Sequence, residues 1–250
     1  MTLFGLIGYP LGHSASSVFF NDKFRKENLV DHNYTNFELR SVDALRSLIN
    51  SNPGLKGLNV TIPHKTTVIP YLDQIDETAR KIGAVNCISI KYGSGKITLK
   101  GYNSDVFGFR ESLLPNLKKH HQQALIIGTG GSAKAVSFVL ENLKIPHVFI
   151  SRNPAGENQT DYAKMEELIP SHQLIINCTP VGMYPQVGDF PEIPYELLTK
   201  DHHLFDLIYN PPETAFLKFG HNFGASIQNG SEMFRLQALK SWEIWKNQSQ

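Results

Sequence analysis

Short apolar runs alternate with segments of helical apolar spacing through the first half of the chain. The apolar runs predict strands at residues 4–8, 33–39, 55–60, 85–92 and 97–101. The helical spacing predicts helices at residues 14–29, 42–49 and 75–82, and Gly83 is expected to cap the last of them. A Gly-Ser-Gly stretch at 93–95 separates the last two strands and predicts a hairpin.

The second half reads as repeated strand–helix units. Near-continuous apolar strands are predicted at residues 124–127, 147–150, 174–177 and 203–207. Helices are predicted at 106–117 and 161–168, and a glycine-rich turn with its helix at 128–142. Strands that are apolar on both faces are typical of a parallel sheet covered by helices on both sides. A final helix at 231–245 carries an apolar stripe that is expected to pack back on the first half.

Composition narrows the class of protein. The 250 residues place the chain between one and two average domains of about 150 residues. With 41% hydrophobic residues the chain can build full cores, and a net charge of +1 gives no broad field for nucleic acid or an anionic membrane. Residues 1–11 are apolar but lack the basic start of a signal peptide, and no run is long enough to span a membrane. We expect a cytoplasmic protein with a small-molecule partner.

The two cysteines point to no disulfide framework. Cys87 and Cys178 both lie in apolar, strand-like runs and show no metal-ligand spacing. A buried thiol in such a run acts as a small hydrophobic side chain. We therefore expect both to be structural, and we expect no metal.

A strand, a glycine turn and a helix follow one another at residues 124–142. Gly128, Gly130 and Ala133 fit the pattern G-x-G-x-x-A, which permits a tight turn, close approach of a pyrophosphate and close helix packing. The first helical amides, at Gly131 and Ser132, would hold the pyrophosphate. The alternative is a plain structural turn, because such glycines also begin ordinary helices.

The end of the next strand indicates which dinucleotide binds. An NAD site wants a carboxylate there to accept from the ribose 2′-hydroxyl. The chain instead has Ser151, Arg152 and Asn153, with no acidic residue before Glu157. The guanidinium suits a 2′-phosphate, so the sequence predicts NADP over NAD. A solvated surface arginine is the alternative.

Several further motifs occur in a fixed order along the chain. They are residues 8–16 (GYPLGHSAS), 59–65 (NVTIPHK), 83–86 (GAVN), 101–105 (GYNSD), 176–183 (INCTPVGM), 206–209 (DLIY) and 230–237 (GSEMFRLQ). With them the chain resembles the shikimate dehydrogenase family over essentially its whole length. The resemblance implies NADP-linked interconversion of 3-dehydroshikimate and shikimate, on the pathway to chorismate and the aromatic amino acids. It also implies a two-domain α/β fold, with a substrate-binding catalytic domain at 1–103 completed by 230–250, and a Rossmann-like NADP-binding domain at 104–229.

The chemistry of the reaction selects two residues. Reduction of a ketone by a nicotinamide needs a positioned proton donor, and Lys65 and Asp105 are the candidates. A lysine beside a carboxylate stays protonated, which suits the reducing direction. In oxidation the two would act as one coupled unit, and the sequence does not assign the titrating member. The alternatives are a solvent-exposed lysine and an aspartate that caps the helix at 106.

Further roles come from the resemblance. Ser14 and Ser16 match the serines that hold the substrate carboxylate, although serines also cap helices. The positions that match residues around the substrate ring are Thr61, Asn86, Tyr209 and Gln237, and those near the cofactor are Thr179, Leu207, Gly230 and Glu77. From the residues alone, Asn86 could instead be a turn asparagine and Tyr209 a core residue. His13 and His64 adjoin the site without a patterned partner, and we expect them to be bystanders.

The chain departs from the family pattern at several positions. Cys87 and Ser104 stand where threonine is usual. Ser151-Arg152-Asn153 replaces Asn-Arg-Thr without a second basic residue nearby, so NADP affinity is expected to be modest. Two other functions remain open: a quinate/shikimate dehydrogenase with relaxed cofactor use, and a catalytically silent dinucleotide sensor on the same fold. The expected oligomeric state is a monomer or a homodimer.

Overall fold

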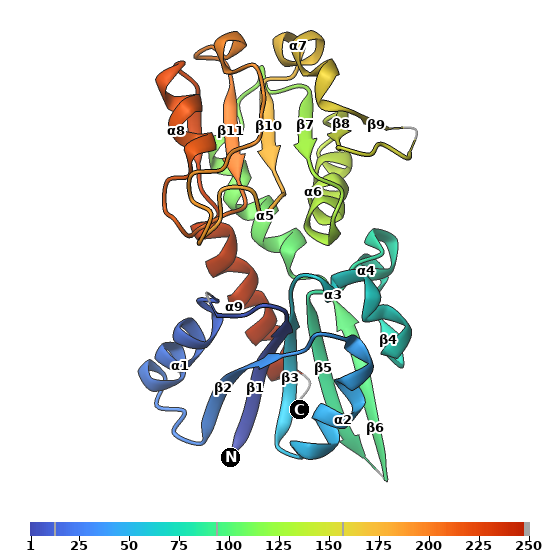
Figure 1. Ribbon diagram of the computed structural model, residues 1–250. Helices are drawn as coiled ribbons and strands as arrows, with labels where there is room; N and C mark the ends of the chain where they lie inside the picture. Colours follow the sequence, from blue (N-terminus) through green and yellow to red (C-terminus); the bar gives the residue numbers. More distant parts are fainter. Residues whose placement is uncertain (13, 94, 157, 248–250) are drawn as a thin grey trace. The chain divides into compact units, whose positions relative to one another are not determined.

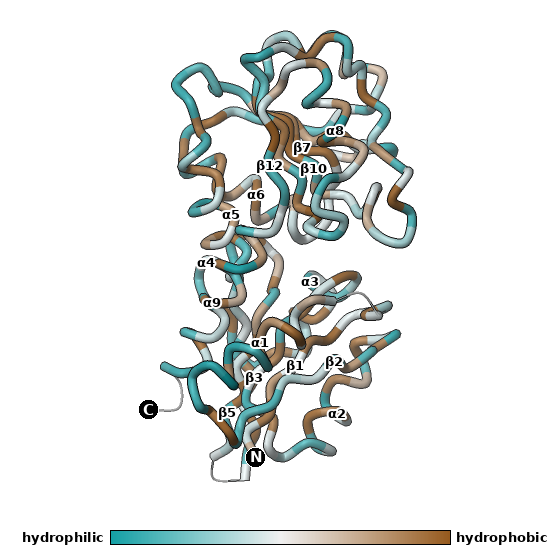
Figure 2. The backbone as a smooth tube through the Cα atoms, turned by 90° about the vertical axis from the view of Figure 1, so that its left-hand side faces the viewer, coloured by the Kyte–Doolittle hydropathy of each residue, from teal (hydrophilic) through white to brown (hydrophobic). Residues whose placement is uncertain are grey.

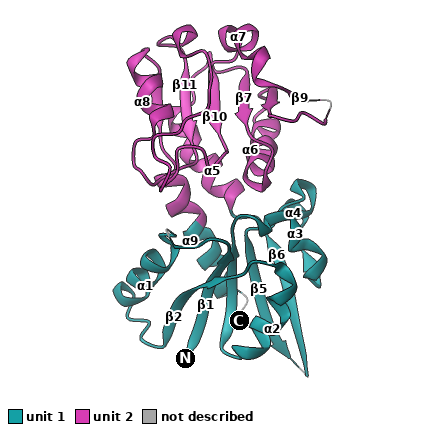
Figure 3. Ribbon diagram, viewed as in Figure 1, with its two compact units in different colours: residues 1–104, 238–250 teal, residues 105–237 magenta. Residues whose placement is uncertain are grey.

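The computed structural model describes residues 1–12, 14–93, 95–156 and 158–247 (Figure 1). The chain forms two compact units (Figure 3). Unit 1 comprises residues 1–104 and 238–250, and unit 2 comprises residues 105–237. The two divisions fall between Ser104 and Asp105 and, inside one helix, between Gln237 and Ala238.

Unit 1 is built on a mixed six-stranded sheet of order β2-β1-β3-β5-β6-β4. Its strands are β1 (Thr2–Gly8), β2 (His32–Glu38), β3 (Leu55–Val60), β4 (Gln74–Ile75), β5 (Cys87–Gly93) and β6 (Lys96–Tyr102). Its helices are α1 (Ser16–Lys26), α2 (Leu45–Ser51), α3 (His64–Thr67) and α4 (Glu77–Ile82). β1 pairs in parallel with β2 and β3, whereas β5 pairs antiparallel with β3 and with β6. The antiparallel β5–β6 pair confirms the predicted hairpin, although Ser94 in its turn lies outside the described residues.

The end of the C-terminal helix α9 (Ser231–Asn247) belongs to the core of unit 1. Trp242 and Trp245 form a cluster with Phe4 and Phe20, and the Trp245 ring lies 4.8 Å from that of Phe4, centroid to centroid. Trp245 Nε1 donates to the Ile88 carbonyl over 3.0 Å. These contacts supply the packing partner that the apolar stripe of the helix requires.

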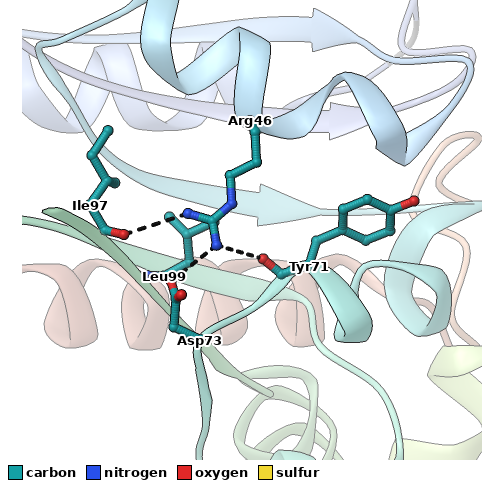
Figure 4. A network of polar contacts seen from close by, with 5 residues as sticks. All are labelled: Arg46, Tyr71, Asp73, Ile97 and Leu99. Atoms are coloured by element: carbon teal, nitrogen blue, oxygen red, sulfur yellow. Dashed lines mark hydrogen bonds and ion pairs between the residues drawn. The ribbon is translucent and has the colours of Figure 1, made fainter.

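A polar network holds α2 to the edge of the sheet in unit 1 (Figure 4). Arg46 donates to the Tyr71 carbonyl and to Asp73 Oδ2, each over 3.1 Å, and to the Ile97 carbonyl over 3.5 Å. Asp73 Oδ2 also accepts from the Leu99 amide over 2.7 Å. The Leu99 amide first, and Arg46 after it, lower the pKa of Asp73. One guanidinium therefore ties together a helix, the segment before β4, and β6.

Unit 2 is built on an all-parallel sheet of order β12-β11-β10-β7-β8-β9. Its strands are β7 (Ala124–Ile127), β8 (His147–Ile150), β9 (Gln159–Thr160), β10 (Leu174–Asn177), β11 (His203–Asp206) and β12 (Ser226–Gln228). Its helices are α5 (Asp105–Leu113), α6 (Gly131–Asn142), α7 (Met165–Leu168) and α8 (Ala215–Asn222), with the first part of α9. In Figure 2, β7 and β10 carry the colour of hydrophobic residues.

Helices cover both faces of this sheet, as the apolar strands predict. Phe109 of α5 and Val136 of α6 belong to one core cluster, and Met165 of α7 and Phe216 of α8 belong to another. The strand order reverses direction between β7 and β10, the point at which doubly wound sheets bind nucleotides. The predicted α/β architecture is confirmed.

The structure differs from the sequence prediction at several short elements. α8, α3 and the strands β4, β9 and β12 were not predicted. α3 and these three strands have only two to four residues each, which is too short to show periodicity. The predicted helix at 75–82 begins only at Glu77, since Asp76 caps it by accepting from the Thr78 amide. Gly83 ends it with a φ of 67°, as predicted. The predicted helix at 161–168 is a 3-10 turn at 162–164 followed by α7.

The second division of the chain also differs from the sequence-based boundary at 229/230. Met233 of α9 packs with Phe109 in the core of unit 2. A Cβ at Gly108 would lie 2.6 Å from the Met233 carbonyl oxygen. The first turns of α9 therefore pack within unit 2, and the helix joins unit 1 only from Ala238 onward.

The two cysteines prove unequal. Cys87 is fully buried in β5, and burial raises the pKa of its thiol to about 12. Cys178 lies just after β10 and is only half-buried, so the prediction of a buried strand position was wrong for it.

No helix among the described residues is long and apolar enough to cross a membrane.

Candidate functional site

The glycine turn of unit 2 has the geometry of an anion site. Gly128 follows β7 with a φ of 103°, a conformation that residues with side chains rarely adopt, and its amide donates to the Ile150 carbonyl over 2.9 Å. Gly130 is extended and caps α6, whose first turn holds no acidic residue. A Cβ at Gly130 would meet no atom within 4 Å. Ala133 is fully buried, which lets α6 pack closely on the sheet.

The open space at Gly130 is the feature that favours a ligand over a plain turn. A structural turn would not need glycine at this position, whose φ of −73° suits any residue. The amides at Gly131 and Ser132 begin α6, where the helix dipole favours a negative charge. The residues present therefore fit the pyrophosphate of a dinucleotide.

Neighbouring loops bring three of the predicted cofactor residues to the same sheet edge. Thr179 follows β10, and a Cβ at Gly128 would lie 2.9 Å from its Cγ2 atom. Leu207 follows β11, and Gly230 packs so closely on it that a Cβ there would collide with the Leu207 carbonyl. Close packing against Leu207 therefore explains a glycine at position 230 without any ligand.

Ser151, Arg152 and Asn153 follow β8 at that edge. The Ser151 amide donates to the Thr160 carbonyl over 2.9 Å, and its hydroxyl accepts from the Asn153 amide over 3.2 Å. Arg152 is exposed. An exposed guanidinium suits a phosphate. Glu157, the nearest following acidic residue, lies outside the described residues.

In unit 1, main-chain hydrogen bonds bring Thr61, Lys65 and Asn86 together. Thr61 follows β3, and Lys65 is on the short helix α3. The Lys65 carbonyl accepts from the Val85 amide over 2.7 Å, and the Asn86 carbonyl accepts from the Val60 amide over 2.8 Å. The motifs 59–65 and 83–86, which are separate in the sequence, therefore meet at one place.

A buried polar network surrounds Asn86. Asn86 Oδ1 accepts from the Ser104 amide over 2.6 Å, and its Nδ2 donates to the Ser104 hydroxyl over 2.9 Å. Asn59 Nδ2 donates to the Asn86 carbonyl over 3.2 Å and to the Ser241 hydroxyl over 2.8 Å. Tyr34 donates to Asn59 Oδ1 over 2.9 Å, and the Ser104 and Ser241 hydroxyls lie 3.0 Å apart. All five side chains are at least nine-tenths buried.

This network fixes the residue that precedes Asp105. Ser104 is bonded through both its amide and its hydroxyl, and Asp105 follows it as the first residue of α5. Asp105 lies inside the helix and not before it, so the helix-cap alternative does not describe its position. Three members of the network, Tyr34, Asn59 and Ser241, were not singled out from the sequence.

The serines at the start of α1 serve the helix in part. Ser14 Oγ accepts from the Ser16 amide over 3.2 Å, and the cap position itself is occupied by Ala15 without a side-chain bond. The first turn of α1 carries no acidic residue. His64 is buried and its Nε2 lies 2.6 Å from the Leu39 carbonyl, as expected of a structural histidine. His13 lies outside the described residues.

The remaining predicted residues have mixed surroundings. Tyr209 is half-buried, with its ring centroid 4.7 Å from that of Phe234. Gln237 is half-buried on α9. Glu77 is exposed on α4 and forms an ion pair of 2.8 Å with Lys81, which lowers the pKa of Glu77. An exposed ion pair one helical turn apart accounts for Glu77 without a ligand.

Known proteins resemble the chain over nearly its full length. The family model described as the shikimate dehydrogenase substrate binding domain matches residues 6–88. The shikimate dehydrogenase (NADP+) of Methanosphaera stadtmanae is 38% identical, over 96% of this chain and 90% of that protein. That of Methanococcus vannielii is 37% identical, over 97% and 90%.

Solved structures agree with these relatives. Shikimate dehydrogenase 1 of Peptoclostridium difficile matches with a TM-score of 0.88 and 35% identity, over 99% of this chain and 92% of that one. A shikimate dehydrogenase in complex with NADP+ matches with a TM-score of 0.85 and 32% identity, over 99% and 90%. A quinate dehydrogenase from Corynebacterium glutamicum in complex with NAD also matches, with a TM-score of 0.84 and 26% identity, over 98% and 94%.

Two glycine substitutions separate a ligand role from a packing role. Gly130→Ala places a methyl group in open space, so we expect the free energy of unfolding to change by less than about 1 kcal/mol. NADP affinity, measured by calorimetry, should fall roughly tenfold or more, because the methyl group meets the pyrophosphate. Gly230→Ala collides with the Leu207 carbonyl and should cost about 1–3 kcal/mol of stability. Unchanged NADP affinity in Gly130→Ala would leave the turn a purely structural one.

Proposed function

The chain belongs to the shikimate dehydrogenase family, and from that premise we propose how its own residues perform the reaction. It is an NADP-dependent oxidoreductase that interconverts 3-dehydroshikimate and shikimate in aromatic biosynthesis. Unit 1 carries most of the residues assigned to the substrate, and unit 2 carries the glycine turn assigned to NADP. The match of residues 6–88 to a substrate binding domain supports the first assignment, and the glycine turn at Gly128 supports the second.

Lys65 and Asp105 are the catalytic pair of this proposal. Bound NADPH would supply the hydride that reaches the ketone carbon. The Lys65 ammonium polarises the ketone and gives its proton to the oxygen, and the Asp105 carboxylate acts together with it. In the oxidising direction the two accept the hydroxyl proton as one coupled unit. The single observation that carries this assignment is a pair of hydrogen bonds: Lys65 bonds to Val85, and the next residue, Asn86, bonds to Ser104, which precedes Asp105.

Substrate recognition is assigned to hydroxyl and amide groups. Ser14 and Ser16, with the first amides of α1, hold the carboxylate, because a helix start without acidic residues favours an anion. Thr61, Asn86, Tyr209 and Gln237 bind the hydroxylated ring. Asn86 uses its side chain to hold Ser104 as well, so its place in the site is fixed before the substrate arrives.

Cofactor binding is assigned to the carboxyl edge of the second sheet. The pyrophosphate binds at the start of α6, and the residues assigned to it are Gly128, Gly130, Gly131, Ser132 and Ala133. Arg152, flanked by Ser151 and Asn153, binds the 2′-phosphate, and Thr179, Leu207 and Gly230 line the nicotinamide side. Glu77 is the assignment with least structural support, since its ion pair with Lys81 explains its position. The cytoplasmic location and the monomeric or homodimeric state stay predictions from the sequence.

A quinate/shikimate dehydrogenase is the nearest second candidate. The quinate dehydrogenase that matches shares 26% identity, below the 32–38% of the shikimate dehydrogenases described above. A silent sensor is disfavoured because it would need neither Lys65 nor Asp105.

Initial rates with shikimate and with quinate, each with NADP and with NAD, separate these functions. We expect turnover with shikimate and NADP and little with the other three pairs. Comparable quinate turnover would support the second candidate. Dinucleotide binding without any turnover would identify a sensor.

Replacing Lys65 removes the proton donor. In Lys65→Met we expect kcat to fall by about 10²–10⁴, because general acid–base catalysis contributes that much. NADP affinity should stay within about twofold of the unmodified protein, since no cofactor contact is assigned to Lys65. Lys91→Met, which removes an exposed lysine of the same unit, serves as the control and should leave both unchanged. Near-normal turnover in Lys65→Met would exclude this lysine from the chemistry.

Replacing Arg152 tests the choice of cofactor. In Arg152→Ala the ratio of kcat/KM for NADP to that for NAD should fall roughly tenfold or more, the value of one charge-assisted contact to phosphate. Arg110→Ala, an exposed arginine of α5, is the matched control and should keep the ratio. A ratio that survives Arg152→Ala would show that another group recognises the 2′-phosphate.

A further inference from the structure

A carboxylate that the proposed mechanism does not use lies buried at the cofactor edge of unit 2. Asp206 ends β11 and is fully buried. In the parallel register it faces Asn177, the fully buried last residue of β10. Thr179 and Leu207, both assigned to the nicotinamide, follow these two strands directly.

Asp206 accepts three hydrogen bonds from three different segments. Thr214 donates its hydroxyl proton to Oδ2 over 2.6 Å. The Ile208 amide and Asn177 Nδ2 donate to Oδ1 over 3.0 and 3.1 Å. An ionised carboxylate is an acceptor only, so it satisfies all three donors.

Asn177 connects Asp206 to the loop that follows β10. Its Oδ1 accepts from the Thr179 amide over 3.0 Å and from the Thr179 hydroxyl over 2.7 Å. Its Nδ2 also lies 3.5 Å from the Val181 carbonyl. Thr214 meanwhile caps α8. One carboxylate therefore joins the loop after β10, the loop after β11 and the start of α8.

Burial disfavours the charged form of Asp206. Burial raises the pKa of Asp206 to about 6, although all three hydrogen bonds act in the opposite direction. Burial first, and the charge of Asp206 after it, raise the pKa of Tyr195. A group that gains protons more readily in the folded state adds stability at low pH and loses that contribution as the pH rises through about 6. Stability at neutral pH therefore does not explain a carboxylate at this position.

We propose that Asp206 is a positioning residue for NADP binding, which holds the loops of Thr179 and Leu207 in place through Asn177 and the Ile208 amide. The inference rests on the cofactor roles proposed for those two residues. Because the loops are held before the cofactor binds, less ordering is left to the binding step, and affinity rises.

Calorimetric titration of NADP into the full chain tests the proposal. Asp206→Ala removes all three bonds, and we expect the dissociation constant to rise roughly tenfold or more. Asp206→Asn keeps Oδ1 for Ile208 and Asn177 and should raise it by less than about threefold. Ser137→Ala is the control: it removes a buried bond to His147 in the same unit and should leave NADP affinity unchanged.

Each result decides between roles. Unchanged NADP affinity in Asp206→Ala, whatever its stability, would overturn the positioning role. If Asp206→Ala does not fold, Asn177→Ala removes the link between Asp206 and the loop of Thr179, and an unaltered dissociation constant in that variant would overturn the role equally. Failure of the unmodified chain to bind NADP would instead overturn the proposed function, and the inference with it.

Discussion

The hydrogen bonds between Asn86 and Ser104 are the constraint on which the proposed catalytic arrangement depends. Both side chains are buried. A buried amide without hydrogen-bond partners would lower the free energy of unfolding by about 1–3 kcal/mol. Their hydrogen bonds hold the chain after β6 against the chain before β5. They therefore fix the position of Ser104, which directly precedes Asp105, the first residue of α5. Ser241 joins the pair from the C-terminal helix, which explains why the last turns of that helix belong to unit 1.

In unit 2, too, buried polar side chains must be hydrogen-bonded, here at the sheet edge proposed to bind the cofactor. Asp206 and Asn177 are buried at the ends of adjacent parallel strands, and their bonds to Ile208 and Thr179 reach the two loops that the proposed function uses. The open space at Gly130 lies at the neighbouring strand, where the sheet reverses its order. Rigid strand ends therefore carry loops whose exposed groups are left for the ligand.

Much of this could be predicted from the sequence because the signals are local. Apolar strands such as β7 and β10, and the glycine turn at Gly128, carry their own pattern within a few residues. The polar network could not be predicted, since Asn59 and Ser241 are 182 residues apart and neither stands in a local pattern that names its partner. The point at which α9 changes from one unit to the other was missed for a related reason: helical spacing shows an apolar stripe but not what the stripe packs on. Among the site residues, Gly230 shows that a family match and a steric requirement can coincide at one position.

The central claim is that Lys65 and Asp105 act as one unit. The most direct test is a double-mutant cycle on kcat, with Lys65→Met, Asp105→Asn and the double variant measured at saturating shikimate and NADP. Residues that act as a unit are strongly non-additive, so the account predicts that the double variant loses no more activity than the worse single variant. Losses that multiply, so that the double variant equals the product of the two single effects, would contradict it.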